Sequence, residues 1–348
     1  MDAIELTDEL HSKGFKHVST EEGVHSETYK IFVNFINYCD ISYMPNNVLN
    51  NLPTIKVNDI KCATPQFMMV DTYRVLTDPL TSYYRLEKSI DRFQKIIKYY
   101  PIDQSQNNTK IDFKENYEIL KFIRKKIIQK TKLVVVGFYA FNYYVKKGSS
   151  KYKLAKFPYY EAISSNLIKD SERIFKVLKK HNIKMKKFHP FITFIDSRVE
   201  YYYNNELVFK LYGNNKRCTI YNYSERKKTY FGTCNLVFMY LLFNYYYYYI
   251  NRDKIYNTIL ILIGKLYDAK NEYLTKHKTT VVDKSPFQDF TYKCFGTPYD
   301  MMRESRLKML EKKSQGKQIK FRYNPCGKPG KVPEFKFNNT SGNIKNNI

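Results

Sequence analysis

One carboxylate stands out because of the residues around it. Asp40 lies near the end of segment 25–45, whose β-branched and aromatic residues predict two short strands or one long bent strand, largely buried. An ionised carboxylate in a buried strand is costly unless a cation, a metal ion or hydrogen-bond donors pair with it. We therefore expect Asp40 either to face a cation, a metal or a cleft, or to lie in water at the end of the strand.

A group of cations forms the second set of candidates. Two consecutive predicted helices between Pro65 and Tyr99 carry basic residues away from their apolar faces, namely Arg74, Arg85, Lys88 and Arg92. Guanidinium and ammonium groups bind phosphate, so these side chains are candidate contacts for a nucleotide or for RNA. A solvated helix face predicts the same spacing, and the sequence leaves both interpretations open. For Asp71 the structural role, an ion pair with Arg74, is preferred.

Composition favours a polyanionic partner. The 348 residues suffice for about two domains, and a hydrophobic share of 43% excludes a chain that is disordered throughout. Lys and Arg number 59 against 33 Asp and Glu, which gives a formal net charge of +26. Such a balance indicates nucleic acid first and an anionic membrane surface second.

The cysteines and the most apolar segments restrict the class of protein further. The 6 cysteines are scattered without metal-ligand spacing, which argues against a zinc ribbon or a disulfide framework and indicates a reducing compartment. Segment 235–250 is short for a membrane span and has Asn244 near its centre. We expect it, with segment 259–263, to form buried helices rather than membrane spans.

The predicted elements fall into two similar series. A helix near residues 6–14 precedes strands that end with Asp40, and a helix near 167–182 precedes strands that end near Lys210. In this alignment Asp40 stands opposite Lys210. Two copies of one α/β unit, the first without its opening strand and helix, account for the order of elements.

Several segments resemble the poly(A) polymerase catalytic subunit of large cytoplasmic DNA viruses. In the first copy these are HSETYKIFVNF with CDISYMP, ATPQFMMVDTYRVLTDPL and YRLEKSIDRF. In the second copy they are VVVGFYAFNYYVKKG, PYYEAIS and KLYGNNKRC, and near the C-terminus SPFQDFTYKCFG and RESR. The resemblance covers almost the entire chain, and DTYRVLTDPL and HSETYKIFVNF are its most specific segments.

The resemblance implies an α+β fold with two nucleotidyltransferase-like mixed-sheet units, the first incomplete, and flanking helices. It divides the chain into the C-terminal part of a catalytic domain (1–100), a linker (101–116), a second, degenerate nucleotidyltransferase-like domain (117–298) and a basic, partly disordered tail (299–348). The implied reaction is transfer of AMP from ATP to the 3′ end of mRNA. Two Mg²⁺ or Mn²⁺ ions on three carboxylates would neutralise the attacking and leaving oxygens.

Asp40 matches the third of these carboxylates, so the resemblance makes it the catalytic and metal-binding residue of this chain. The Gly-rich turn and the carboxylate pair would lie upstream of Met1. In the second copy Gly137 matches the turn, but the three carboxylate positions hold Tyr159, Glu161 and Lys210, which indicates a non-catalytic copy.

The partners follow from the same resemblance. We expect single-stranded RNA as the partner and no membrane, and either a homodimer or a second protein that supplies the missing N-terminal strand. The implied location is the host cytoplasm or the virion. The alternative is a non-catalytic scaffold that binds RNA or dimerises.

Overall fold

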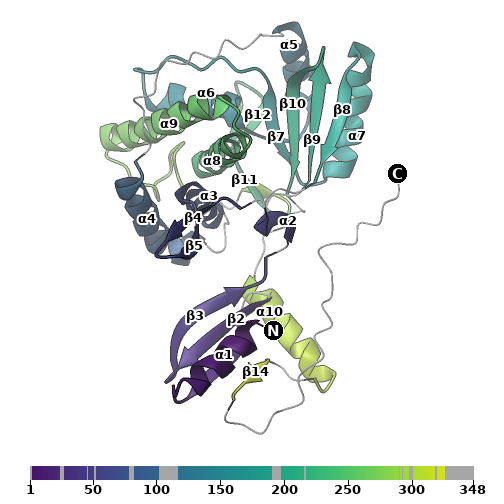
Figure 1. Cartoon of the computed structure of the whole chain (residues 1–348). Helices are drawn as coiled ribbons and strands as arrows, with labels where there is room; N and C mark the ends of the chain where they lie inside the picture. The colour runs from purple at the N-terminus through teal and green to yellow at the C-terminus, as the bar shows by residue number, and fades with distance from the viewer. Residues whose placement is uncertain are drawn as a thin grey trace. The chain divides into compact units, whose positions relative to one another are not determined.

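The computed structural model describes residues 2–23, 27–44, 46–50, 52–77, 82–101, 117–189, 197–214, 217–289, 291, 293–297, 301–317 and 320–325. The chain forms two compact units (Figure 1). Unit 1 combines Met1–Met44 with Asp300–Ile348, and unit 2 is Pro45–Tyr299. The predicted linker 101–116 lies outside the described residues, apart from Pro101, and so does the chain beyond residue 325.

Unit 1 is a small antiparallel sheet with two helices. Helix α1 (Asp2–Ser12) precedes β1 (Val18–Glu22), β2 (Thr28–Val33) and β3 (Ile36–Ser42), and α10 (Met301–Ser314) precedes β14 (Arg322–Tyr323). The strand order is β14-β1-β2-β3. Asn34 and Phe35 form the β2–β3 turn with positive φ at both positions, the geometry that matches the twist of a two-residue hairpin.

The strands of segment 25–45 are confirmed, but the prediction that they are largely buried is wrong for β3. Ile36 is 63% exposed and Tyr38 68%, and Phe35 in the preceding turn is 77% exposed. The reason is position: β3 is the last strand of the sheet in the described part of the chain, whereas β2 lies inside it and buries Ile31 and Val33.

Unit 2 is built on a mixed sheet with the strand order β13-β11-β12-β6-β7-β10-β9-β8. The pairs β12/β6 and β7/β10 are parallel and the other pairs are antiparallel, which confirms the predicted mixed α+β class. The sheet strands are β6 (Val134–Val136), β7 (Tyr160–Ser164), β8 (Lys184–Phe188), β9 (Arg198–Tyr203), β10 (Glu206–Gly213), β11 (Thr219–Ser224), β12 (Thr229–Gly232) and β13 (Cys294–Phe295).

Helices and one separate hairpin complete this unit. The helices are α2 (Asn46–Leu49), α3 (Pro65–Leu76), α4 (Ser82–Tyr99), α5 (Tyr117–Lys126), α6 (Gly137–Gly148), α7 (Leu167–Leu178), α8 (Cys234–Ile250) and α9 (Ile255–His277), with 3₁₀ turns η1 (Ile128–Lys130) and η2 (Lys179–His181). The hairpin is β4 (Thr54–Val57) with β5 (Ile60–Ala63), joined by the Asn58-Asp59 turn.

Helix α8 is the centre of the core of unit 2. Its residues are buried from Cys234 to Tyr246, and it packs against α9 and α3. This confirms the prediction of buried helices, and no helix in the described residues is both long and apolar enough to cross a membrane.

Tyr73 of α3 stacks on Phe238 of α8 with ring centroids 5.2 Å apart. Helix α3 therefore packs with the second half of the chain, and the compact units divide the chain at other places than the predicted boundaries.

A disulfide joins Cys218 to Cys294, at the place where β11 pairs with β13. The scattered cysteines were expected to form no disulfide framework and to indicate a reducing compartment, and this bond departs from that expectation. The two residues are 76 positions apart and meet only through sheet pairing, which cysteine spacing does not encode. Cys39, Cys62 and Cys234 are free.

Candidate functional site

Asp40 lies on the exposed edge strand of unit 1. Its Oδ1 accepts a hydrogen bond of 3.1 Å from the Asn37 side chain, and Lys30 stands opposite it on β2. No group of three or more His, Cys, Asp and Glu side chains gathers anywhere in the described ranges. A divalent cation needs several oxygen ligands, so the described surroundings of Asp40 do not by themselves make a metal site.

In unit 2 the equivalent strand carries a buried lysine. Lys210 on β10 is 2% exposed, and it faces Glu161 on β7 and Glu200 on β9 at one level of the sheet. Its Nζ lies 3.9 Å from Glu161 Oε1 and 3.4 Å from both the Asn244 Oδ1 and the Tyr248 hydroxyl of α8. Burial lowers the pKa of Lys210, but Tyr248, Glu161 and Glu200 outweigh it and raise the pKa above its usual value. The lysine is thus a buried ammonium group.

Glu161 is held from several sides. Its Oε1 accepts hydrogen bonds from the Tyr212 hydroxyl (2.9 Å) and the Asn244 amide (2.7 Å), while its buried Oε2 has no hydrogen-bond partner in the described structure. Oε2 lies against Gly137, the first residue of α6, where an added Cβ would come within 1.8 Å of it. The strand–turn–helix at Gly137 therefore packs directly on this carboxylate. The ammonium group of Lys210 holds the cation position, so the residues present do not fit a divalent metal.

The hairpins that carry Asp40 and Lys210 match residue by residue. Both turns consist of two residues with positive φ, Asn34-Phe35 and Asn204-Asn205. Counted from the turn, the register of β3 and of β10 shifts between the second and third paired residues. Asp40 and Lys210 are the fourth paired residues of these two strands. Their opposite partners are Lys30 and Glu200, so the charges are reversed between the two hairpins.

This match supports the predicted repeat. In each copy a helix precedes three strands that pair in sequence order, α1-β1-β2-β3 and α7-β8-β9-β10. In unit 2 the outer edge of the third strand pairs in parallel with β7, which carries Glu161. In unit 1 no described strand pairs with the corresponding edge of β3.

The four predicted cations lie on α3 and α4 of unit 2. Arg74 forms an ion pair with Asp71 (Nε to Oδ1, 2.8 Å), as predicted for that aspartate. Arg85, Lys88 and Arg92 are exposed at helical spacing on one face of α4. These contacts fit both a phosphate-binding role and a solvated helix face, and the role of the four residues stays a prediction. Asp40 belongs to the other compact unit.

A second buried ion pair lies beside the Lys210 cluster, which consists of Lys210, Glu161, Asn244 and Tyr248. This pair was not predicted from the sequence. Arg198 donates from Nε to Glu200 Oε1 over 2.8 Å and from its NH2 group to the Tyr247 hydroxyl over 3.0 Å. Burial raises the pKa of Glu200, but Lys210, the Tyr202 hydroxyl and Arg198 outweigh it and hold the pKa below 4.5. Arg198, Glu200 and Tyr202 alternate along β9 and so share one face of the sheet. Lys210 and Tyr247 come from β10 and α8, so the sequence around β9 does not reveal the complete set of partners.

Two family models match this chain. The first, described as "APMV, Putative poly(A) polymerase, catalytic subunit, C-terminal", matches residues 94–348. The second, "Poly(A) polymerase catalytic subunit", matches residues 1–82. The two matches lie one after the other and leave only a short segment between them.

Named relatives agree with these models. A protein of Acanthamoeba polyphaga mimivirus named "Putative poly(A) polymerase catalytic subunit" is 28% identical over 98% of this chain and 67% of its own length. A protein of the same name from African swine fever virus (strain Badajoz 1971 Vero-adapted) is 34% identical over 29% of this chain and 22% of its own length. The chain thus spans about two thirds of the mimivirus relative.

A solved structure shares the fold. The crystal structure of the Megavirus polyadenylate synthase aligns with a TM-score of 0.77 at 28% identity, and the alignment covers 93% of this chain and 68% of that one. At 93% of the chain the alignment reaches both compact units, and the matches of the two family models also include residues of both units. The chain belongs to the poly(A) polymerase catalytic-subunit family.

Proposed function

We propose that this chain acts in poly(A) polymerase-type transfer of AMP from ATP to the 3′ end of mRNA. Membership of the family supports this, and the net charge of +26 suits an RNA partner. The observation that carries the assignment to residues is the match between the two hairpins, which gives Asp40 the position that Lys210 occupies in the degenerate copy.

Asp40 is the catalytic carboxylate in this proposal. It is exposed, it stands on the strand whose outer edge has no described partner, and a single asparagine amide holds its Oδ1. A nucleotide substrate and a divalent metal are general to the family. In this chain the metal would be Mg²⁺ or Mn²⁺, Asp40 would be one ligand, and the other ligands would come from residues outside the described set or from a second chain.

Unit 2 contributes binding rather than chemistry. The Lys210 ammonium group excludes a second metal centre there, because two cations would compete for Glu161. The exposed cations Arg85, Lys88 and Arg92, together with Arg74, are proposed contacts for RNA or nucleotide phosphates. The proposed location is the host cytoplasm or the virion, where the family's viral members would meet mRNA.

The test is extension of a labelled oligoadenylate with ATP and Mn²⁺. The chain alone should bind the RNA and extend it little, because its described residues supply one metal carboxylate. The protein that extends the RNA is either this chain alone or this chain with the partner that completes the site. In that protein, Asp40→Asn should abolish extension and leave RNA binding unchanged. Asp59→Asn removes another exposed carboxylate and should change neither. Full activity of the Asp40 variant would refute the assignment.

The second candidate is a non-catalytic scaffold that binds RNA or dimerises. The buried Lys210–Glu161 pair favours it for unit 2, because that copy has exchanged a metal for a fixed ammonium group. Specific RNA binding with no extension under any supplement would favour the scaffold for the entire chain.

A further inference from the structure

A cavity in unit 2 combines aromatic walls with positive charge. Its volume is about 230 Å³, and it lies between α5, the start of α6 and the start of β7. Its walls include Tyr117, Lys121 and Arg124 of α5, Tyr139 of α6, Phe157 just before β7, and Tyr160 at the start of β7. No acidic side chain is among the described residues that line it.

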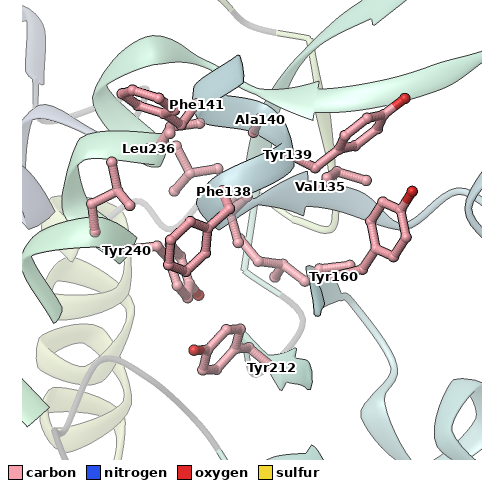
Figure 2. Close-up of a cluster of buried hydrophobic side chains, with 14 of the residues drawn as sticks. Val135, Phe138, Tyr139, Ala140, Phe141, Tyr160, Tyr212, Leu236 and Tyr240 are labelled. Carbon is pink, nitrogen blue, oxygen red and sulfur yellow. The ribbon is translucent and has the colours of Figure 1, made fainter. Parts of the chain in front are cut away.

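This cavity is separate from the Lys210 cluster. Successive residues of a strand point to opposite faces of a sheet, so Tyr160 and Glu161 of β7 face opposite ways. Figure 2 shows Tyr139 and Tyr160 together on one side of the hydrophobic cluster, with both hydroxyl groups pointing away from it, and Tyr212 apart from them. The residues that line the cavity are therefore not those that surround Lys210 and Glu161.

Three rings form the inner wall. The centroids of Tyr139, Phe157 and Tyr160 lie 5.1 to 5.6 Å apart in pairs, all in tilted or edge contacts. Tyr117 stands at the rim and is 64% exposed, with Lys121 Nζ 5.8 Å from its ring centroid. An exposed ring beside a cation offers a stacking surface and a positive charge together, and every base has a π-face that can stack on such a ring.

The charge at this place is positive and incompletely paired. The Nε of Arg124 is buried and has no hydrogen-bond partner in the described structure. Behind Tyr139 lies Lys227, whose Nζ is 4.8 Å from the Tyr139 ring centroid. Burial lowers the pKa of Lys227, and the charges of Lys146, Arg226 and Arg124 lower it further. Cations that repel one another favour an anionic ligand, which would relieve the repulsion.

We propose that this cavity, the Arg124 pocket, binds one nucleotide of single-stranded RNA, with the base against the rings and a phosphate on Arg124 and Lys121. This deepens the proposed function and rests on it, because it places part of the RNA path on the non-catalytic copy. The volume suits one base rather than an entire triphosphate nucleotide, since sites for drug-sized ligands span roughly 300–1,000 Å³. Lys227, whose Nζ lies 4.8 Å from the Tyr139 ring centroid, adds positive charge beside the pocket for a neighbouring phosphate.

The experiment is fluorescence anisotropy of a fluorescein-labelled oligoadenylate with the full chain at several salt concentrations. Arg124→Ala should weaken binding about fivefold or more and reduce the salt slope by about 0.7, the value for one phosphate contact on a single strand. Lys126→Ala removes an exposed cation from the same helix and should change affinity less than about twofold.

The rim tyrosine separates stacking from charge. Tyr117→Ala should weaken binding about fivefold or more at an unchanged salt slope, because one stacked base is lost, and Tyr117→Phe should bind like the parent. Tyr117 is 64% exposed, so both variants should keep the fold. ATP should not displace the RNA from this pocket at concentrations that saturate the reaction.

The outcomes are distinguishable. If the parent binds RNA but Arg124→Ala and Tyr117→Ala both bind like Lys126→Ala, the pocket is no RNA contact and the inference fails, while the proposed function stands. If ATP competes for the pocket, its ligand is the nucleotide substrate and the inference fails in that respect. If the parent binds no RNA, the proposed function fails first.

Discussion

The residue at the third-strand position decides what each copy can do. An exposed aspartate such as Asp40 offers an oxygen ligand to a cation, whereas a buried lysine such as Lys210 is itself the cation. Lys210 contacts Glu161, Asn244 and Tyr248, so the buried charges of Lys210 and Glu161 compensate each other without a metal ion. The same hairpin geometry thus supports a potential ligand site in one copy and a closed structural centre in the other.

This interpretation predicts the cost of removing the lysine. Lys210→Met leaves the charge of Glu161 buried without its ammonium group, and loss of one partner of a buried pair costs about 3–5 kcal/mol. Adding Glu161→Gln removes the stranded charge and should restore at least half of that stability. Urea unfolding of both variants measures the difference. Lys186→Met, at an exposed position of β8, should stay within about 0.5 kcal/mol. Equal stability of the single and double variants would contradict the pairing.

Glu200 predicts how stability depends on pH. Its folded pKa lies below 4.5, so around that pH the unfolded chain binds more protons than the folded one. The stabilisation is therefore complete above about pH 4.5 and is lost as pH falls through the lower, folded value. Thermal unfolding from about pH 7 to about pH 3 should show a steeper acid loss for the parent than for Glu200→Gln. Glu206→Gln, at an exposed position of β10, should keep the parental slope.

At the scale of elements, the turn between β6 and α6 depends on one glycine. Gly137 has φ +64°, and an added Cβ would lie 1.8 Å from Glu161 Oε2. Gly316 has nearly the same φ, +63°, with nothing within 4 Å of the added Cβ. Both alanine variants should lose about 1–3 kcal/mol of folding stability through backbone strain. Only Gly137→Ala should lose more, because its new Cβ would collide with the Glu161 carboxylate. Thermal unfolding of the two variants tests this, and equal losses would show that the carboxylate moves aside freely.

Elements with a clear period or turn signal were predictable from the sequence. The apolar face that begins at Pro65 indicates a helix, and α3 is that helix. The dipeptides Asn58-Asp59 and Asn204-Asn205 are typical of two-residue hairpin turns, and they connect β4 to β5 and β9 to β10. The equivalence of Asp40 and Lys210 also followed from the order of elements, because it depends on distance from a turn.

Pairings between distant segments were not predictable. Strands β13 and β14 have two residues each and so carry no period, and each forms only by pairing with a strand far away in the sequence. The exposure of β3 and the partners of Glu161 depend on which segments meet, which a local pattern does not encode. For the same reason the apolar face of α3 gave no sign that its partner is Phe238 of α8.

The organisation of the whole molecule leads to the last prediction, because unit 2 is continuous in sequence and unit 1 is not. A chain of residues 45–299 contains every strand of the mixed sheet and the Arg124 pocket, so it should unfold cooperatively and keep most of the RNA affinity. A chain of residues 1–299 lacks α10 and β14, and with them the ion pairs Lys312–Glu22 (3.2 Å) and Arg322–Glu21 (3.1 Å).

Hydrogen exchange checks the prediction at a single amide. The Glu22 N–H donates to the Phe321 carbonyl over 2.9 Å, so it should exchange much faster in the 1–299 chain, while amides of α8 stay protected. Protection of Glu22 in both the full chain and the 1–299 chain would mean that β1 is stable without its C-terminal neighbour. Loss of protection in α8 would mean that the two units fold as one, because cooperative folding would then transmit the truncation from one to the other.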